Sequence, residues 1–225
     1  MTTTKSRAST VQKVVSPRAG VEAWLVEDYA VPLVAFEFAF KGGSSQEAAT
    51  KQGAASMLAA LLDEGAGDLD ADAFHRALDD RAVEISFSAD RDSFHGRMKT
   101  LVRNLDYAVD LLALAVEKPR LDADAIERVR AQMIAGLRRE LKDPDALCGK
   151  AFREAAFGDH PYGQAGRGTL DTVPAITRDD LAGLRALLMT RGALKVAVVG
   201  AIDAAALAVH LDRVFGGLPA KGALK

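Results

Sequence analysis

The side chains best suited to metal or proton chemistry in this sequence are widely spaced. A zinc site on one helix needs two histidines three or four positions apart, so that both imidazoles face the same ion. No two of the four histidines have that spacing, and one cysteine alone excludes an internal disulfide or a multi-cysteine metal centre. We expect the cysteine to be a small apolar core residue. These five residues are His75, His95, His160, His210 and Cys148.

The composition is that of an ordinary globular protein. The 225 residues, 49% of them hydrophobic and 27% charged, can form a continuous core. The formal net charge of −2 gives no electrostatic basis for binding nucleic acid or an anionic membrane surface. No apolar run approaches the roughly 20 residues of a membrane span. Met1–Ser16 is too polar to contain the apolar part of a secretory signal.

Five segments are expected to form strands, because they are rich in β-branched and aromatic residues or alternate between apolar and polar positions. The alternation is clearest at Phe36, Phe38 and Phe40. Short turns at Asp28–Ala30 and Asp90–Asp92 would join four of the strands into two hairpins, which indicates a mainly antiparallel sheet. The five segments are Gly20–Glu27, Val31–Phe40, Val83–Ser88, Ser93–Leu101 and Leu194–Val199.

Seven further segments have apolar residues at helical spacing or are rich in strong helix formers. Gln52–Asp63 is almost wholly apolar, which predicts a helix buried on most sides. The order of elements indicates an α+β fold, a mainly antiparallel sheet with helices packed on one face. No Gly-rich phosphate loop follows a strand, so nucleotide binding has little support. The other helices are expected at Asp70–Asp79, Leu105–Val116, Asp122–Lys142, Ala146–Ala156, Asp179–Leu188 and Ala204–Phe215, with a loop at Gly158–Gly168.

Several short segments follow one another in a distinctive order. They are Lys41–Ser45 before the helix from Gly53 to Gly65, Asp143-Pro144, His160–Gly163 with Gly168-Thr169, Ile176–Leu181, and Lys195–Asp203 leading to Phe215–Pro219. Each signal is weak alone, but in this order the chain resembles the pitrilysin-like metallopeptidases, which include insulysin and the mitochondrial processing peptidases. The resemblance implies one amino-terminal lobe at residues 14–219, a disordered lead-in at 1–13, and the start of an inter-lobe linker at 220–225.

In active members of this family, a helix bearing His-x-x-Glu-His holds zinc. The two histidines bind the ion and the glutamate activates a bound water. Aligning that pattern with the apolar helix places Ser56 and Ala60 at the histidine positions and Ala59 at the position of the general base. The resemblance therefore implies that the chain carries neither these two ligands nor the base.

The third zinc ligand of the family is a glutamate on a later, long helix. Counting eight residues back from Pro144, where that helix ends, places Gly136 at this position, and its separation from Ala60 is the one that the family pattern requires. Glycine offers no side-chain ligand. Glu64 and Glu140 lie one turn beyond the vacant positions and are expected to be surface or capping residues. We expect no metal and no catalytic residue in this chain.

Peptide binding would instead rest on backbone pairing. In the catalytic lobe an extended substrate adds to a sheet edge, and the resemblance makes the strand Val83–Ser88 its counterpart. The candidate residues are Val83, Glu84, Ile85, Ser86, Phe87 and Ser88; the alternative is an interior strand covered by its neighbours. A second candidate contact is the Gly158–Gly168 loop, through His160, Tyr162 or Arg167. Its alternative is a turn that only fixes the chain direction.

The resemblance implies a non-catalytic subunit or lobe that helps an active sister chain enclose and hold a peptide. Zinc would be present only in that sister, which would carry the intact His-x-x-Glu-His. The other expected partners are the peptide and a second lobe of the same protein. Two alternatives stay open, a structural scaffold like the core subunits of the respiratory cytochrome complex and an active metallopeptidase with an unrecognised site. The resemblance to bacterial subunits favours a periplasmic or exported location without deciding the compartment.

Overall fold

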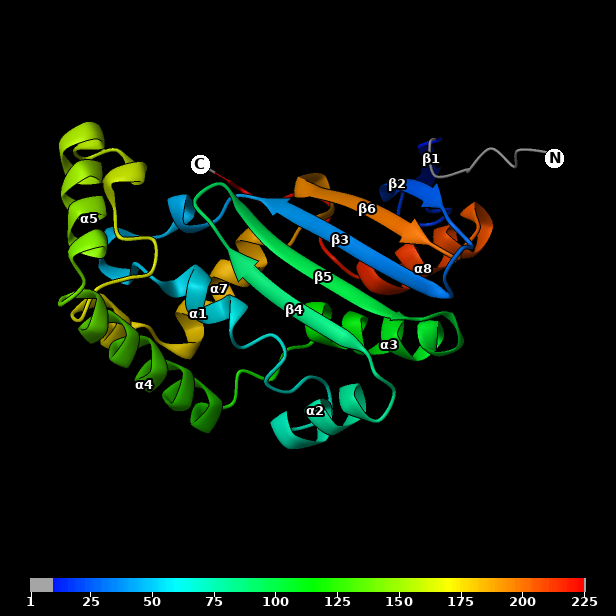
Figure 1. Ribbon diagram of the computed structural model, residues 1–225, viewed down its shortest axis with the longest axis horizontal. Helices are drawn as coiled ribbons and strands as arrows, with labels where there is room; N and C mark the ends of the chain where they lie inside the picture. Colours follow the sequence, from blue (N-terminus) through cyan, green and yellow to red (C-terminus); the bar gives the residue numbers. More distant parts are fainter. Residues whose placement is uncertain (1–9, 225) are drawn as a thin grey trace.

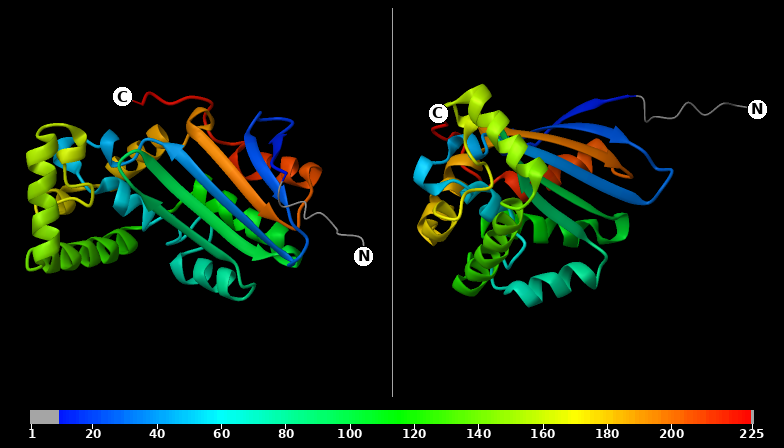
Figure 2. Two further views of the ribbon diagram at one scale, coloured as in Figure 1. Left: turned by 45° about the horizontal axis from the view of Figure 1, so that its top comes forward. Right: turned by 60° about the vertical axis from the view of Figure 1, so that its left-hand side comes forward.

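The computed structural model describes residues 10–224, which form one twisted six-stranded sheet with helices packed on one of its faces (Figure 1). The two views in Figure 2 show that the opposite face carries no helix. The α+β fold expected from the sequence is therefore confirmed. The strands are β1 (Gln12–Val15), β2 (Glu22–Glu27), β3 (Leu33–Lys41), β4 (Glu84–Ala89), β5 (Ser93–Leu101) and β6 (Leu194–Gly200).

Seven helices agree with the expected ones to within a few residues, except that the apolar helix α1 is shorter, and the short helix α6 was not expected. Short 3-10 turns connect several elements: η2 (Ser44–Gln46), η3 (Ala49–Lys51), η4 (Val102–Asn104), η5 (Pro161–Gly163) and η6 (Arg191–Ala193). No helix in the described part of the chain is long and apolar enough to cross a membrane. The helices are α1 (Ala54–Ala59), α2 (Ala71–Asp79), α3 (Leu105–Glu117), α4 (Ala123–Glu140), α5 (Pro144–Phe157), α6 (Thr172–Ala175), α7 (Arg178–Leu188) and α8 (Ala204–Phe215).

The strand order is β1-β2-β6-β3-β5-β4, and every neighbouring pair is antiparallel except β2 with β6. The expected hairpin of β2 with β3 is wrong, because β6 lies between them. The register gives the reason. Val198 of β6 lies opposite Leu25 on one side and Phe36 on the other, and all three side chains are fully buried. Inserting β6 therefore extends the apolar face of the sheet without a gap.

The sheet also begins earlier than expected. Gln12 and Lys13, which belong to the predicted lead-in at residues 1–13, already pair with β2 as part of β1. Val14 of the same strand is buried, so its pairing extends the core. The rest of that prediction, residues 1–9, lies outside the described residues.

Aromatic side chains link the sheet to the helices behind it. Phe36, Phe38 and Phe40 alternate into the buried face of β3 as predicted. The ring of Phe38 packs edge-on against Phe215 of α8, with ring centres 5.2 Å apart. Gly96 of β5 leaves the space for this ring, since a Cβ there would lie 2.2 Å from the Phe38 Cζ atom. Edge-to-face packing of this kind adds to the free energy gained from burial.

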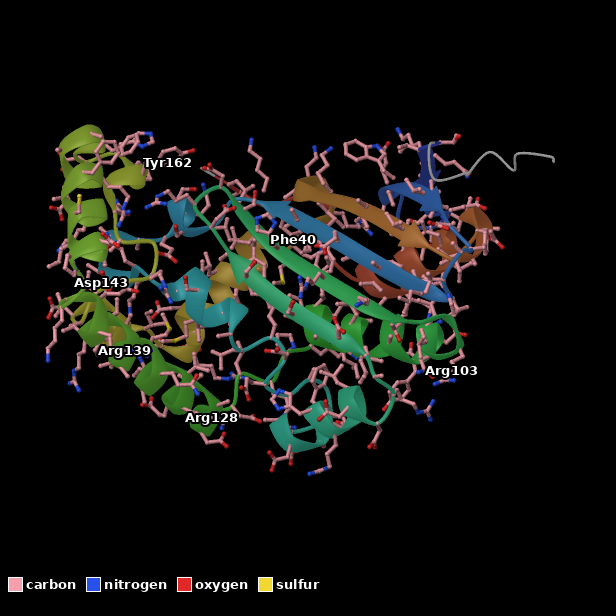
Figure 3. All side chains as sticks on the ribbon, in the orientation of Figure 1. Phe40, Arg103, Arg128, Arg139, Asp143 and Tyr162 are labelled. Carbon is pink, nitrogen blue, oxygen red and sulfur yellow. The ribbon has the colours of Figure 1, made fainter. Side chains whose placement is uncertain are left out.

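The helices α4 and α5 meet at Asp143, at the end of the molecule beyond β4 (Figure 3). The Asp143 side chain accepts a hydrogen bond from the N–H of Asp145 and caps α5, which starts at Pro144 because proline fits the first turn of a helix. No residue of α5 is buried. Cys148 on this helix is exposed, so the prediction of a buried core cysteine is wrong.

Candidate functional site

The vacant zinc positions lie on α1 and α4, which face each other across a hollow. Ser56 on α1 and Leu137, the residue after Gly136 on α4, both line this hollow. Ala59 is buried, and Ala60 is an exposed residue at the end of α1. A Cβ added to Gly136 would meet no atom within 4 Å. None of the four residues that the resemblance assigns to these positions offers a metal-binding side chain.

No other group of residues replaces these ligands. His75 lies in α2, His95 in β5, His160 before η5 and His210 in α8. His95 Nε2 lies 2.9 Å from an oxygen of Asp90, and His210 is largely buried, which lowers its pKa. Within residues 10–224 there is no cluster of three or more histidine, cysteine, aspartate or glutamate side chains that could hold a metal ion. The described residues do not fit zinc.

The two glutamates beyond the vacant positions are both paired with arginines. Glu64 binds Arg128 of α4, and the Glu140 carboxylate lies 2.8 Å from Arg167 of the loop after η5. Both pairs are partly exposed, so each contributes little to stability. These glutamates therefore tie α4 to neighbouring segments, in keeping with the surface role expected for them.

A glycine-rich segment, residues 163–168, packs directly onto the start of α1. Ser56 donates its hydroxyl hydrogen bond to the Gly166 carbonyl at 3.2 Å. A Cβ at Gly53 would lie 2.9 Å from the Arg167 carbonyl oxygen, and one at Gly168 would lie 2.6 Å from the Gln52 carbonyl oxygen. Only glycine allows so close an approach of two backbones. The loop therefore covers one end of the helix that would hold the metal in an active relative.

The three loop candidates are engaged within the protein itself. His160 accepts a hydrogen bond from the N–H of Tyr162, and the Tyr162 hydroxyl donates to Asp92 at 2.5 Å. Arg167 is paired with Glu140, as described above. The loop is thus tied to the β4–β5 turn on one side and to α4 on the other, and these contacts position it beside the vacant site.

The peptide-binding candidates lie on an edge of the sheet. β4 is the last strand in the order and pairs only with β5, so the alternative of an interior strand does not hold. Alternate residues of an antiparallel strand direct their backbone groups to opposite sides. Asp90 donates its N–H to Ser93 across the hairpin, whereas Val83 donates its N–H away from β5, to the Leu78 carbonyl.

Ile85 and Phe87 lie two and four residues after Val83. Their backbone N–H and C=O groups therefore also point away from β5. Within the described residues, neither of these two has a backbone hydrogen bond outside the sheet. Their side chains point into the protein, where Phe87 packs edge-on against Phe38. Glu84, Ser86 and Ser88 alternate with these residues and direct their backbone groups toward β5. Ile85 and Phe87 therefore offer two outward N–H groups and two outward carbonyls to an added strand, and Ala89 at the end of β4 has the same orientation.

The sequence profile of the insulinase family, peptidase family M16, matches residues 25–170. This chain belongs to the M16 family. It is 27% identical to the non-peptidase homolog YmxG of Helicobacter pylori over 69% of this chain and 36% of that protein. It is 32% identical to an uncharacterized zinc protease of Mycobacterium leprae over 72% of this chain and 36% of that protein. The chain thus spans about a third of the length of these curated relatives.

A solved structure of the inactive domain of a peptidase M16 from Pseudomonas fluorescens superposes with a TM-score of 0.90 and 26% sequence identity. The superposition covers 96% of this chain and 52% of that one. The resemblance to pitrilysin-like proteins noted from the sequence is therefore confirmed, and the fold belongs to the M16 family over nearly the whole chain.

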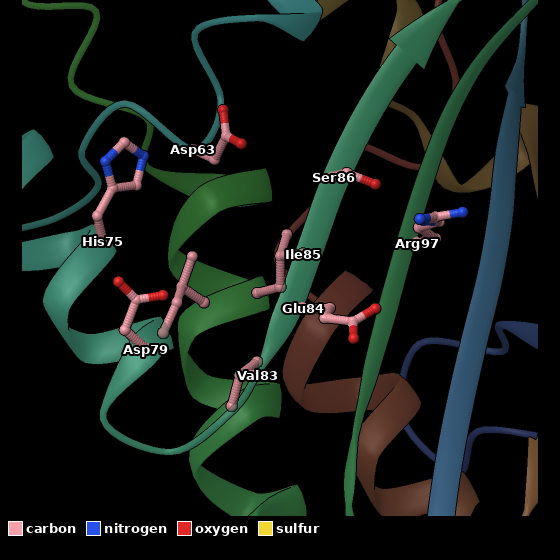
Figure 4. Close-up of a pocket in the computed structure, with 9 residues that line it drawn as sticks. Asp63, His75, Asp79, Val83, Glu84, Ile85, Ser86 and Arg97 are labelled. Atoms are coloured by element: carbon pink, nitrogen blue, oxygen red, sulfur yellow. The ribbon is translucent and has the colours of Figure 1, made fainter.

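The M16 lobe has a hollow at each end of β4. The first, which we call the Asp63 hollow, has a volume of about 460 Å³ and lies beside the start of the strand. Figure 4 shows Asp63, His75 and Asp79 on the helix side of β4, and Glu84 and Arg97 on the other side. Burial raises the pKa of Asp63. This hollow gives an added strand room along the outward edge of β4.

The second, which we call the Arg91 hollow, has a volume of about 560 Å³, within the range of small-ligand sites. It lies between the β4–β5 turn, α1, and the angle formed by α4 and α5. Its apolar lining includes Leu137, Leu141 and Leu147, and Arg91 lines it from the turn. Ser56, the residue that the resemblance assigns to the first histidine position, also lines this hollow.

Sequence reasoning found β4 but missed both hollows. His75 and Asp79 lie one turn apart on α2, as their spacing indicates, but only the fold of the chain brings Asp63 beside them. Arg91 carried a weak signal, since it lies in the polar turn between two expected strands. That turn was interpreted only as a connection.

Proposed function

We propose that this chain is a non-catalytic lobe of an M16 peptidase assembly, which holds an extended peptide along β4 for an active sister chain. The observation that carries the proposal is the free edge of β4, where the backbone groups of Ile85 and Phe87 point outward. Added strands gain affinity mainly from main-chain hydrogen bonds.

The absence of zinc chemistry is supported by the residues at the four family positions, Ser56, Ala59, Ala60 and Gly136. It is also supported by the non-peptidase homolog of Helicobacter pylori and by the inactive domain of Pseudomonas fluorescens among the relatives. The zinc would be in the sister chain, which would carry the intact His-x-x-Glu-His motif. A second lobe of the same protein and the peptide complete the proposed assembly.

The first experiment tests strand addition with modified peptides. N-methylation removes an amide hydrogen without removing a side chain, so a peptide methylated at alternate residues loses all the N–H donors along one edge. Two peptides of opposite methylation parity serve as matched controls for each other. We expect one methylation pattern to bind full-length protein like the parent peptide, and the other to bind about 5- to 150-fold more weakly, because two net hydrogen bonds contribute roughly 1–3 kcal/mol. Equal affinities for the two methylated peptides would contradict pairing along an edge.

The second experiment tests the sister chain. Full-length protein is mixed with the M16 chain that carries His-x-x-Glu-His, and cleavage of a long peptide is followed with each chain alone and with both. We expect a stable heterodimer whose cleavage rate exceeds the rate of either chain alone. Equal cleavage by the sister alone would contradict the proposed role, and a heterodimer without any cleavage would favour a structural scaffold.

A further inference from the structure

The Arg91 hollow is lined by equal numbers of basic and acidic side chains, but not every one of them has a partner. Two of its cations are paired with its acids: Arg167 with Glu140 at 2.8 Å, and Lys150 with Glu154 at 3.7 Å. Asp90 of the same hollow accepts hydrogen bonds from the backbone N–H groups of Asp92 and Ser93 and lies next to His95. Glu140, Glu154 and Asp90 therefore already have partners within the protein.

Two cations and one acid of the hollow remain. Arg91 and Arg153 have no ion pair within residues 10–224, and Asp145 lies in the first turn of α5, where a helix stabilises negative charge. Arg91 is the more informative of the two arginines. Its Nε atom is buried and has no hydrogen-bond partner among the described residues.

A buried cationic N–H without an acceptor is unfavourable, because the group has lost its water without gaining a partner. A guanidinium group binds a carboxylate through two parallel N–H···O bonds, which no single neutral acceptor can match. The hollow therefore has the chemistry of a carboxylate site, with an apolar wall formed by Leu137, Leu141 and Leu147 for a neighbouring side chain.

The position of Arg91 relates this site to the peptide edge. Arg91 is the second residue after the end of β4, and Ala89, the last residue of β4, lines the same hollow. An extended chain advances about 3.3 Å per residue. A peptide that lies along the six residues of β4 would thus deliver the next residue at this end to the hollow.

We propose that the Arg91 hollow binds a carboxylate at one end of the peptide held on β4, either a free C-terminus or an Asp or Glu side chain. This inference rests on the proposed peptide-holding function. In this proposal, Arg91 anchors one end of the peptide beside the position that the resemblance assigns to zinc in active relatives.

The test measures the dissociation constants of three six-residue peptides for the full-length protein. One ends in leucine with a free carboxylate, one is its C-terminal amide, and one is the amide with a glutamate before the leucine. Loss of a charge-assisted hydrogen bond costs about 1.5–3 kcal/mol, so we expect the plain amide to bind at least about tenfold more weakly than the free acid. Tight binding of the glutamate peptide would identify a side-chain carboxylate as a ligand, and weak binding would identify the C-terminus; both support the site.

Matched variants assign the effect to the arginine. Arg91→Gln should reduce affinity for the free acid to that for the amide and leave affinity for the amide unchanged. Arg103→Gln serves as the control, because Arg103 is exposed and lies at the far end of the sheet (Figure 3). Equal binding of all three peptides by the wild-type protein would overturn the carboxylate site. If the two N-methylated peptides still differed in affinity, peptide binding along β4 would stand and only the carboxylate site would be rejected. If they did not differ, the proposed peptide-holding function would be rejected as well.

Discussion

The Ser56 hydroxyl on α1 donates a hydrogen bond to the Gly166 carbonyl oxygen at 3.2 Å. In the alignment that the family resemblance implies, Ser56 takes the place of the first zinc-binding histidine. Its side chain instead fastens the glycine-rich loop to the helix.

The first prediction concerns metal content. After dialysis against zinc and removal of excess metal, we expect the purified chain to retain less than about one tenth of an equivalent of zinc, because a catalytic site needs three protein ligands and the described residues provide none together. Atomic absorption would measure the metal. Stoichiometric zinc that disappears in His75→Ala or His160→Ala would contradict the prediction and indicate an active peptidase with a different site.

The second prediction concerns the glycine at the third vacant ligand position. Gly136 lies inside α4 and an added Cβ would meet no atom within 4 Å, so Gly136→Ala should raise the free energy of unfolding by about 0.5–1 kcal/mol. Gly53→Ala is the matched contrast, because Gly53 has φ of +94° and its Cβ would lie 2.9 Å from the Arg167 carbonyl oxygen. It should lower stability by about 1–3 kcal/mol. Urea denaturation would measure both, and a destabilised Gly136→Ala would show that the position requires glycine.

The third prediction is a pH dependence that arises at Glu47. Burial raises the pKa of Glu47 from its ordinary value of 4.5 to about 7, although its carboxylate accepts hydrogen bonds from the N–H groups of Ala55 and Gly53. The unfolded chain therefore loses this proton at lower pH than the folded protein. The resulting stability is fully present below pH 4.5 and is lost as pH rises to about 7. The loss amounts to up to about 3 kcal/mol.

Glu47→Gln tests this assignment, because glutamine cannot ionise. Its free energy of unfolding should fall less between pH 4.5 and 7 than that of the wild type, by about the same 3 kcal/mol at most. Replacing the exposed Glu37 of β3 in the same way is the control and should leave the wild-type profile in place. An unchanged slope in Glu47→Gln would mean that the carboxylate ionises without cost in the folded protein.

The fourth prediction concerns the start of α7. Burial alone would raise the pKa of Asp180, but hydrogen bonds from Lys51 and Thr177 outweigh it and lower the pKa from its ordinary value of 3.8 to about 2. This stability is present above pH 3.8 and is lost as pH falls through 2. Asp180→Asn should lower stability at pH 7 by about 1–2 kcal/mol, as expected for a broken capping box with an ion pair.

The neighbouring Asp179 provides the matched control for this variant. It precedes Asp180 in the same exposed first turn but takes no part in the capping box, so Asp179→Asn should change stability by less than about 0.5 kcal/mol. Thermal unfolding at about pH 7 and about pH 3, on either side of the ordinary carboxyl range, would measure both variants. Equal effects of the two substitutions would show that general charge, and not the bonds of Asp180, stabilises the helix.

Local patterns in the sequence were enough to predict most helices and strands. Alternation of Phe36, Phe38 and Phe40 marks β3 because neighbouring strand residues face opposite sides of a sheet. The assignment of Ser56 and Gly136 to zinc positions rests on ligand spacing along a helix, which is a local property, and it stays a prediction. The end of α4 could also be predicted from the sequence, because Pro144 lacks the N–H that a continuing helix needs.

Only the tertiary structure decided which strands are neighbours and which side chains meet. β6 lies between β2 and β3 although more than 150 residues of chain separate it from both, because its buried face completes the apolar surface between Leu25 and Phe36. The same long-range packing makes β4 an edge and surrounds Arg91 with residues from α1, α4 and α5. Spacing along the chain shows which side chains share a face of one helix or strand. A sheet edge and a hollow, in contrast, depend on contacts between segments that are distant in sequence.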